Sequence, residues 1–464
     1  MIVELSYPGD LTDTAALAGQ LSSTGLSPAA CQSRAQQFAK AAAALSVICD
    51  ASRMQRAMAF FVPGRIEVLG KHTDYAGGRT MVAAVERGFA IVAVPGDGSR
   101  TTVIDAQSGE TVRFLISPEL IPPSRSWSNY LMTVARRVAR NFPTNSYRGA
   151  DVALLSDLPR AAGLSSSSAL MVSVFLVLAE ANRLSARDDY WHSIGNKNAD
   201  LAGYLGTVEN GQSFGTLQGD RGVGTFGGSE DHTAILCAEA NHISQYSYCP
   251  VEFEKMVPMP PGHVFAVAGS GITAQKTGAA REKYNAASQL AAALAELWRR
   301  ETGRDDPHLA AALGSAPDAA ERLQSLLRTA DTLPFERAAL AARLEHFMTE
   351  SGEIIPEAGN SLAAGDLRAF GRLVDRSQQA AEQLLGNQMP ETAFLAAAAR
   401  RLGAAAASAF GAGFGGSDWA LVEAERADGF LAAWADAYRA DFPQHAPAAS
   451  FFLTAAGPAA FRVC

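Results

Sequence analysis

The sequence predicts an α+β protein of two domains, and three observations lead to this prediction. The chain has 464 residues, which is too long for one ordinary hydrophobic core. Hydrophobic residues make up 48% of it and charged residues 19%, a composition typical of a well-buried globular protein. Strand-like runs recur up to residue 270, and Ala-rich helical patterns follow from about residue 274 to 400. We place the domain boundary so that residues 1–236 form the N-terminal domain and residues 237–464 the C-terminal domain.

Charge and cysteine content limit the classes of function. The formal net charge is -8 and no basic run is present, so nucleic acid and anionic membranes are poor partners. The five cysteines are widely spaced and include no CxxC pair, which indicates neither a disulfide framework nor a zinc site. The N-terminus carries acids where a signal peptide would be basic, and no apolar run reaches the ~18 residues of a membrane span. We therefore expect a cytoplasmic protein.

The first clear element is a helix at residues 27–47. Ser27 is a suitable N-cap, Pro28 falls in the first turn, and Ala-rich turns follow. The next pattern, RIEVLG, alternates apolar and polar side chains like a half-buried strand, and FAIVAV predicts another strand.

A polar loop connects these two strands. It contains Lys71, His72, Thr73, Asp74 and Tyr75, and such a cluster between apolar strands is well placed to line a small-molecule site. Gly64 to His72 superficially resembles a P-loop, but five residues separate the glycines and His follows Lys71 where Walker A requires Ser or Thr. His72 alone is more often a hydrogen-bonded structural histidine than a catalyst.

A serine-rich loop at residues 159–169 is the stretch around which the chain is organised. The strand-like run ADVALLSDL precedes it, and ALMVSVFLVLAEANRL follows it as a buried helix. Backbone N–H groups at a helix N-terminus lack intrahelical partners, and the helix dipole adds positive charge there, so this arrangement binds phosphate. The hydroxyls of residues 165–168 add donors and possible Mg²⁺ ligands. The competing interpretation is an ordinary serine-rich N-cap.

Residues 200–236 are expected to be rich in loops. Five glycines between Gly219 and Gly228 indicate tight turns or a close backbone approach to a ligand. Asp231 follows them, and Glu209 lies upstream. A carboxylate after a glycine-rich turn serves as a general base or a metal ligand, or it caps the next helix.

The remaining chain carries one more loop pattern of interest. Strand-like pieces end in HVFAVAGS, and helices follow, with Tyr284 in the polar stretch AREKYN. Gly411 to Gly416 matches GxGxxG, but WALVEA after it is a strand pattern, so the loop joins two strands and a dinucleotide-binding fold is not expected. Its glycines allow it to pack against the serine-rich loop.

Three blocks in this order resemble the GHMP small-molecule kinases, and among them the galactokinases. VPGRIEVLGKHTDYAGG is similar to the galactokinase block ending in Gly-Glu-His-x-Asp-Tyr, and LPRAAGLSSSSAL to the nucleotide-phosphate motif Pro-x-x-x-Gly-Leu-Ser-Ser-Ser. FGAGFGGSDWALV is similar to the third, glycine-rich motif, and GGSEDHTAIL stands where galactokinases have a glycine-rich turn and Asp-Gln. The resemblance extends from about residue 30 to the C-terminus and implies a GHMP-kinase-like fold with the active site in the cleft between the domains.

The resemblance also implies roles for individual residues. Asp231 would be the base that takes the proton from the sugar hydroxyl, with Arg65 beside it. Ser167, just before the position where the family usually has Ala, and Glu209 would contact Mg²⁺. The sugar would be held by Lys71, His72, Asp74 and Tyr284. The ATP phosphates would be wrapped by Gly163, Leu164, Ser165, Ser166, Ser167 and Ser168, together with Gly413 and Gly415.

One departure from the family bears on the sugar. Galactokinases have Glu where this chain has Lys71, near the C6 hydroxyl of the sugar. A cation there would favour a C6 carboxylate, as in galacturonate, through a charge-assisted contact. Alternatively, Lys71 still hydrogen-bonds a neutral galactose hydroxyl or pairs with an acid such as Glu67, and we favour this alternative.

The function expected from these features is that of an ATP- and Mg²⁺-dependent sugar-1-kinase, most simply a galactokinase. The alternatives are a galacturonate kinase, a GHMP kinase of another alcohol, and a non-catalytic sugar and ATP sensor. A sensor would be expected to lack the base, the arginine or part of the serine loop, and all three are present. We expect a monomer or weak homodimer whose partners are the sugar and ATP.

Overall fold

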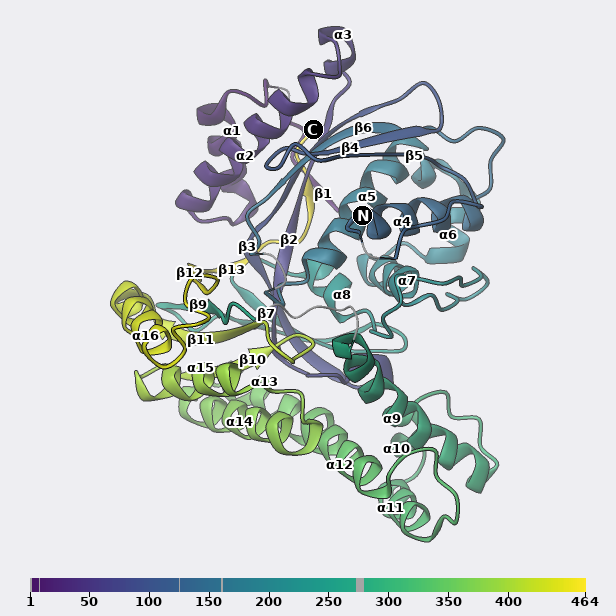
Figure 1. The fold of residues 1–464 in the computed structure, drawn as a ribbon, viewed down its shortest axis with the longest axis vertical. Coiled ribbons are helices and arrows are strands. Elements are labelled where there is room, and N and C mark those ends of the chain that lie inside the picture. Colours follow the sequence, from purple (N-terminus) through teal and green to yellow (C-terminus); the bar gives the residue numbers. More distant parts are fainter. Residues whose placement is uncertain (1, 8, 125, 160–161, 273–278) are drawn as a thin grey trace.

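The structure is a computed structural model that describes residues 2–7, 9–124, 126–159, 162–272 and 279–464. Within these residues two β-sheets of unequal size are packed against helices, and a group of further helices extends from the smaller sheet (Figure 1). The α+β fold class expected from the sequence is confirmed.

The larger sheet has ten strands in the described part of the chain. These strands are β1 (Val3–Glu4), β2 (Met58–Leu69), β3 (Arg79–Pro95), β4 (Arg100–Asp105), β5 (Thr111–Leu115), β6 (Ala150–Ser156), β7 (His242–Ser247), β8 (Glu252–Pro258), β13 (Ala456–Gly457) and β14 (Phe461–Arg462). The main path runs β1-β14-β2-β3-β6-β4-β5, while β7 and β13 pair with β3 and β8 pairs with β7. The β4–β6 and β1–β14 pairs are parallel, and the others are antiparallel.

Helices cover both faces of this sheet because its central strands are apolar on both sides. Phe61 of β2 packs with one helical layer and Phe60 with the other. The first layer is α1 (Thr14–Leu21) and α2 (Pro28–Ser46), with the short α3 (Ala51–Met54) after it. The second layer is α4 (Ser128–Asn141), α5 (Ser166–Ala181), α6 (Asp188–Ile194), α7 (Asn198–Asn210) and α8 (Glu230–Cys237). The helix expected at residues 27–47 is confirmed as α2, whose N-cap Ser27 accepts a hydrogen bond from the Ala30 N–H.

The smaller sheet is fully antiparallel, in the order β10-β11-β9-β12. Its strands are β9 (His263–Gly269), β10 (Ala406–Phe410), β11 (Ser417–Glu423) and β12 (Ser450–Thr454). Phe370 of α14 (Leu367–Ala380) packs near Trp419 on one face, and Trp434 of α16 (Ala427–Asp441) packs with α15 (Pro390–Arg401) on the other. The glycine loop at residues 411–416 joins β10 to β11, so the prediction of two strands there is confirmed.

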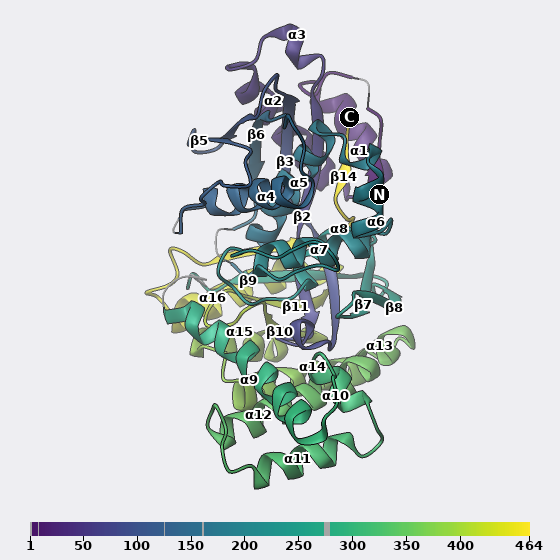
Figure 2. The same cartoon turned by 90° about the vertical axis from the view of Figure 1, so that its right-hand side faces the viewer.

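The helical extension forms a small core of its own. Figure 2 shows α9–α12 stacked at the end of the molecule away from the larger sheet. Leu294 and Trp298 of α9 (Ala279–Thr302) are fully buried there against Leu323 of α11 (Ala319–Thr329). The other elements of this region are α10 (Leu309–Gly314), α12 (Arg337–Phe347), η4 (Met348–Ile354), α13 (Ile355–Ala363) and η5 (Ala381–Leu385). Short helical turns elsewhere in the chain are η1 (Ser22–Thr24), η2 (Asp74–Ala76), η3 (Leu184–Ala186) and η6 (Ala424–Arg426). Among the helices that the structure describes, none combines the length and apolar character needed to cross a bilayer.

The stretch at residues 200–236 contains more helix than the sequence analysis expected. Residues 198–210 form α7, and residues 230–237 form α8. The glycines on which the loop expectation was based, Gly219 to Gly228, lie between these two helices, and a glycine within α7 serves packing. A Cβ on Gly206 would lie 2.9 Å from Ser229 Cα, so glycine lets α7 approach the segment that begins α8.

The division of the chain at residue 236 remains a prediction. The two strands that follow it, β7 and β8, still belong to the larger sheet, as do β13 and β14 near the C-terminus. The chain passes from the larger sheet to the smaller one between residues 258 and 263, where β8 ends and β9 begins. It returns to the larger sheet after β12.

Candidate active site in a cavity between the two sheets

A cavity of about 750 Å³ is lined by residues of the polar loop, the serine-rich loop, the stretch at 200–236 and the glycine loop at 411–416. It is lined by the start of α5, the ends of β2 and β10, the loop after β10, and residues of α7, α8 and α9. A volume of this size is typical of a small-molecule site. Its apolar and aromatic lining residues include Phe89, Trp127, Tyr130, Leu154, Leu158 and Leu170.

A bulge in β2 directs Arg65 into this cavity. The β2–β3 register shifts between Pro63 and Arg65, and the intervening Gly64 has no room for a side chain, because a Cβ would lie 2.8 Å from Leu164 O. The backbone N–H of Arg65 donates to Leu164 O at 3.2 Å. Strand β2 and the serine-rich loop are therefore in direct backbone contact at this point.

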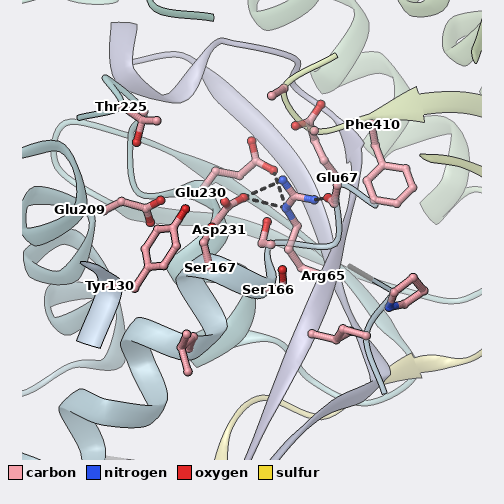
Figure 3. Close-up of a pocket in the computed structure, with 18 of the residues that line it drawn as sticks. Arg65, Glu67, Tyr130, Ser166, Ser167, Glu209, Thr225, Glu230, Asp231 and Phe410 are labelled. Carbon is pink, nitrogen blue, oxygen red and sulfur yellow. Dashed lines mark hydrogen bonds and ion pairs between the residues drawn. The ribbon is translucent and has the colours of Figure 1, made fainter. Parts of the chain in front are cut away.

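The guanidinium of Arg65 joins the serine-rich loop to Asp231. Its Nη1 donates to Gly163 O at 2.5 Å, and its Nε and Nη2 lie 2.8 and 2.6 Å from Asp231 Oδ1 (Figure 3). Arg65 is only 4% exposed. Burial alone would lower its pKa, but the charges of Asp231 and Glu230 outweigh burial and raise it, so Arg65 is a permanent cation.

The serine-rich loop forms the mouth of α5, as predicted. Ser165 is the N-cap in the left-handed conformation, with φ of 57°, and its side chain makes no capping hydrogen bond. The first N–H groups of α5 are thus left to other partners, and Ser165, Ser166 and Ser167 line the cavity. Arg160 and Ala161 of this loop lie outside the described residues.

Ser168 has a position that the sequence analysis did not foresee. It is fully buried, and its Oγ lies 2.8 Å from Glu209 Oε2 and 3.1 Å from Asp231 Oδ2. The hydroxyl has one proton, so it cannot donate a full hydrogen bond to both carboxylates at once. His232 Nε2 lies 3.4 Å from the same Glu209 oxygen. Ser168 therefore connects the carboxylate expected to act as base with the carboxylate expected to contact Mg²⁺.

The three residues His72, Asp74 and Tyr284 all line the cavity. Asp74 Oδ2 accepts the Glu230 N–H at 3.0 Å, and burial raises the pKa of this carboxyl. His72 has both ring nitrogens engaged, Nδ1 at 2.9 Å from the Tyr75 hydroxyl and Nε2 at 3.1 Å from Ala412 O. Because a carbonyl only accepts, Nε2 of His72 carries a proton. These contacts fit a histidine that positions its neighbours, and the expected sugar contacts of all three residues remain predictions.

Lys71 is directed away from the cavity and is not among its lining residues. It is 1% exposed, and its Nζ donates to Ser408 Oγ at 2.8 Å and reaches Ser377 Oγ at 3.4 Å. Ser377 in turn donates to Glu350 Oε1 at 2.9 Å. The proposed direct contact between Lys71 and a sugar C6 group is therefore not supported by this arrangement. The suggested pairing with Glu67 has electrostatic support, because the charge of Lys71 lowers the pKa of that carboxyl.

The loop between β10 and β11 packs against the serine-rich loop, as expected. Ser417 Oγ donates to Ala162 O at 2.5 Å, and a Cβ on Gly411 would lie 3.2 Å from Gly163 O. Gly413 and Gly415 line the cavity with φ values of 76° and 120°, which favour glycine. A Cβ on Gly413 would lie 2.3 Å from Asn387 O, so this loop requires glycine for space as well.

Two carboxylates that line the cavity, Glu67 and Glu230, were not predicted from the sequence as site residues. Glu67 lies on β2, two residues after Arg65, and Glu230 directly precedes Asp231. Both line the cavity and are 3% and 5% exposed. The signal in the sequence was weak, since a charged residue in an alternating strand is normally solvent-exposed and an acid in the first turn normally complements the helix dipole.

The residues expected to contact Mg²⁺ are one hydroxyl, of Ser167, and one carboxylate, of Glu209. Ser167 and Glu209 both line the cavity, and no cluster of three or more His, Cys, Asp or Glu side chains suited to a metal occurs among the residues described. Magnesium is usually held by one or two carboxylates together with substrate phosphates, so a single carboxylate and a hydroxyl beside a phosphate-binding loop fit this ion.

Three family signatures match this chain. The galactokinase galactose-binding signature matches residues 51–95, the GHMP kinases N terminal domain matches residues 129–205, and the GHMP kinases C terminal domain matches residues 360–440. The first contains Arg65 and the polar loop, and the second contains the serine-rich loop.

Curated relatives of similar length carry the name galactokinase. The galactokinase of Roseiflexus sp. (strain RS-1) is 28% identical over 381 residues, covering 81% of this chain and 86% of the relative. The galactokinase of Exiguobacterium sibiricum is 27% identical over 416 residues, covering 87% and 93%.

Solved structures show the same fold. Lactococcus lactis galactokinase complexed with galactose has a TM-score of 0.70 at 22% identity, covering 88% of this chain and 95% of that one. Methanococcus jannaschii mevalonate kinase has a TM-score of 0.50 at 11% identity, covering 86% and 98%. In its three matching signatures, in the order of the blocks around the cavity and in its fold, the chain is similar to the GHMP kinases, and galactokinases are among its relatives.

Proposed function

We propose that the protein is an ATP-dependent sugar-1-kinase that converts ATP and galactose to ADP and galactose 1-phosphate. The observation that carries this proposal is the position of Asp231, whose carboxylate lies between Arg65 and Ser168 beside the mouth of α5. A base is thereby held next to a phosphate-binding loop in a cavity large enough for both substrates.

Each group has a simple part in the transfer. Asp231 takes the proton from the anomeric hydroxyl as the oxygen of that hydroxyl attacks the γ-phosphorus. Arg65, which contacts both Asp231 and the carbonyl of Gly163, keeps the carboxylate ionised and offsets negative charge on the transferred group. Phosphoryl transfer requires mainly positioning and charge neutralisation, so these groups suffice.

The substrates would occupy different parts of the cavity lining. The N–H groups and hydroxyls of Ser165, Ser166 and Ser167, with the glycine loop at 411–416, would hold the ATP phosphates. Ser167 and Glu209 would hold Mg²⁺, which neutralises phosphate charge when bound. The aromatic side chains of Trp127 and Tyr130 suit the adenine ring, and Asp74 and Tyr284 suit sugar hydroxyls.

The cavity favours galactose over galacturonate. Among the described residues that line it, Arg65 is the one Lys or Arg side chain, and its guanidinium already contacts Asp231. A sugar carboxylate would instead meet Glu67, Asp74 and Glu230. The non-catalytic sensor is disfavoured because the base, the arginine and the serine-rich loop are all in place. The monomeric or weakly dimeric state and the cytoplasmic location stay predictions.

The test measures ADP release from ATP and Mg²⁺ with galactose, galacturonate and other sugars as acceptors. Turnover of galactose that Asp231→Asn reduces by about 10³-fold or more supports the proposal. Asp331→Asn is the matched control, because it makes the same chemical change at an exposed residue outside the cavity. Absence of turnover with every sugar, while ATP still binds, would move the protein to the sensor class.

A further inference from the structure

Two buried carboxylates beside Asp231 each have one oxygen that accepts no hydrogen bond from the described residues. Glu67 and Glu230 are more than nine-tenths buried, and Oε1 of each accepts no hydrogen bond. Both side chains line the cavity next to Arg65 (Figure 3). Buried polar atoms in folded proteins nearly always have partners, so each of these oxygens requires an explanation.

The nearest cationic side chains, Arg65 and Lys71, donate their hydrogen bonds to other groups. The Nε and Nη2 atoms of Arg65 contact Asp231, and Nη1 donates to a backbone carbonyl, which leaves Glu230 Oε1 at 3.5 Å from Nε. Lys71, in the loop after β2, donates to serine hydroxyls of the smaller sheet and α14, and its charge lowers the pKa of Glu67 only in part against the effect of burial. The protein thus places two acids at the cavity wall and directs its donors elsewhere.

Keeping both buried carboxylates ionised costs free energy when no ligand is bound. Burial raises the pKa of Glu67 to about 7, and burial followed by the charge of Glu67 raises the pKa of Glu230 well above its usual range. Burial therefore makes the ionised form of each side chain less favourable than it is in an exposed glutamate. A bound cation would reverse this, because it stabilises the ionised carboxylates.

The pair lies at the part of the cavity assigned to the sugar. The backbone N–H of Glu230 donates to Asp74 Oδ2, so Glu230 and Asp74 are adjacent, and Tyr284 lines the same wall. Glu67 alternates along β2 with buried Ile66 and Val68 and is therefore on the side of the strand that carries Arg65.

We propose that Glu67 and Glu230 bind an ammonium group on the acceptor, so that the preferred acceptor of this kinase is an amino sugar. This inference rests on the sugar-kinase function proposed above and specifies its substrate class. An ammonium has three donors and a positive charge, which match the unsatisfied oxygens of two carboxylates. A neutral hydroxyl supplies one donor and no charge, and a uronate adds a third negative charge.

The chemical step is unchanged by this choice of acceptor. The anomeric oxygen forms a bond to the γ-phosphorus, the bond from that phosphorus to the β,γ-bridging oxygen breaks, and the anomeric proton passes to Asp231. The ammonium takes no part in the transfer and acts only in recognition.

Selectivity among three acceptors tests the inference. We expect kcat/KM for 2-amino-2-deoxygalactose to exceed that for galactose by about tenfold or more, since hydrogen bonds to charged groups contribute on that scale. N-Acetylgalactosamine, which keeps the nitrogen but lacks its charge, loses this advantage. Glu67→Gln and Glu230→Gln bring the ratio of the amino sugar to galactose towards one, whereas Glu321→Gln at an exposed position of α11 leaves it unchanged.

A measurement on the unmodified protein tests the inference even if the Glu67 and Glu230 variants do not fold. Calorimetric titration in two buffers of different ionisation enthalpy should show protons released near pH 7 when the amino sugar binds, and not when galactose binds. Galactose turnover with no preference for the amino sugar, and no proton release, would overturn this inference and leave the kinase function standing. No turnover of any sugar would instead overturn the proposed function, and this inference with it.

Discussion

Arg65 Nη2 lies 2.6 Å from Asp231 Oδ1, and this ion pair connects elements that are 166 residues apart in the chain. Arg65 comes from a bulged strand of the larger sheet and Asp231 from the first turn of α8. Because the same guanidinium also holds Gly163 O, one side chain fixes the distance between the proposed base and the phosphate-binding loop. We therefore expect the geometry of the proposed transfer to depend on Arg65 as well as on Asp231.

Arg65→Lys should lower kcat by about 10²- to 10³-fold while changing KM for ATP much less. A lysine keeps the charge and has three donors, but they all lie on one nitrogen, so it does not reproduce the planar fork that spans from the Asp231 carboxylate to the Gly163 carbonyl. Steady-state kinetics with galactose would measure the effect. Arg376→Lys is the control, since Arg376 makes an exposed ion pair with Glu353 outside the cavity. A normal kcat in Arg65→Lys would show that the bridging geometry is not required.

Ser168→Ala should lower kcat by roughly tenfold and raise the Mg²⁺ concentration needed for half-maximal rate. The substitution removes the hydroxyl that lies between Glu209 and Asp231, so the two carboxylates repel each other with no donor to share. The acidic limb of the pH–rate profile should move to higher pH, because a carboxylate that loses a hydrogen-bond donor is protonated more easily.

Ser173→Ala is the matched control for Ser168→Ala. Ser173 is also a buried serine of α5, but its hydroxyl donates only to Ala169 O within the helix. Equal kinetic effects in the two variants would indicate a general loss of helix packing rather than a role for Ser168 between the carboxylates.

Glu67→Gln should become progressively more stable than the wild-type protein as pH rises from about 5 to 7. The pKa of Glu67 is about 7 in the folded protein against an ordinary value of 4.5, so the folded state holds a proton that the unfolded state releases in this window. Stability of the wild type is therefore lost as pH rises through the window, on the order of 3 kcal/mol in total. Glutamine does not titrate, so the free energy of unfolding of the variant does not decrease for this reason between pH 5 and 7.

Urea unfolding at several pH values would measure this difference. Glu321→Gln, an exposed substitution in α11, should follow the wild type at every pH. A constant offset between Glu67→Gln and the wild type from pH 5 to 7 would mean that Glu67 is ionised throughout and that its burial has little electrostatic consequence.

Lys71→Met should cost roughly 2 kcal/mol of stability and leave the preference for galactose over galacturonate unchanged. Lys71 is buried among hydroxyls of Ser377 and Ser408, and its charge offsets part of the rise that burial causes in the pKa of Asp418. Thermal unfolding and the acceptor panel measure the two effects separately. Lys40→Met, exposed on α2, is the control. A switch in sugar preference would restore Lys71 as a specificity residue.

The local features of the site were predictable from the sequence. A strand, a glycine and serine loop and a helix follow one another within 32 residues at 150–181, so the phosphate loop was visible as a pattern. The β10–β11 hairpin was predictable for the same reason, since its strands flank the glycine loop directly. Short-range periodicity and turn residues carry this kind of information.

Orientation of single side chains was not predictable, because residues distant in the chain decide it. Lys71 belongs to the polar loop, yet Ser377 and Ser408, more than 300 residues away, draw it out of the cavity. The site role of Glu67 depends in the same way on the bulge at Gly64 and on the arrival of α8. Tertiary contacts of this range leave no periodic signal in the sequence.

Gly411→Ala should raise KM for ATP by about tenfold and affect KM for the sugar less. The added Cβ would lie 3.2 Å from Gly163 O, and Gly411 has φ of 80°, which an alanine adopts only at a cost of about 1–2 kcal/mol. Both effects separate the glycine loop from the serine-rich loop, and so they disturb the surface proposed to hold the phosphates. Fluorescence or calorimetric titration with ADP would report binding directly. Gly429→Ala on α16 is the control, because apart from the adjoining backbone of its own helix no atom lies within 4 Å of the added Cβ. Unchanged ADP affinity in Gly411→Ala would mean that the phosphates contact the serine-rich loop without help from the glycine loop.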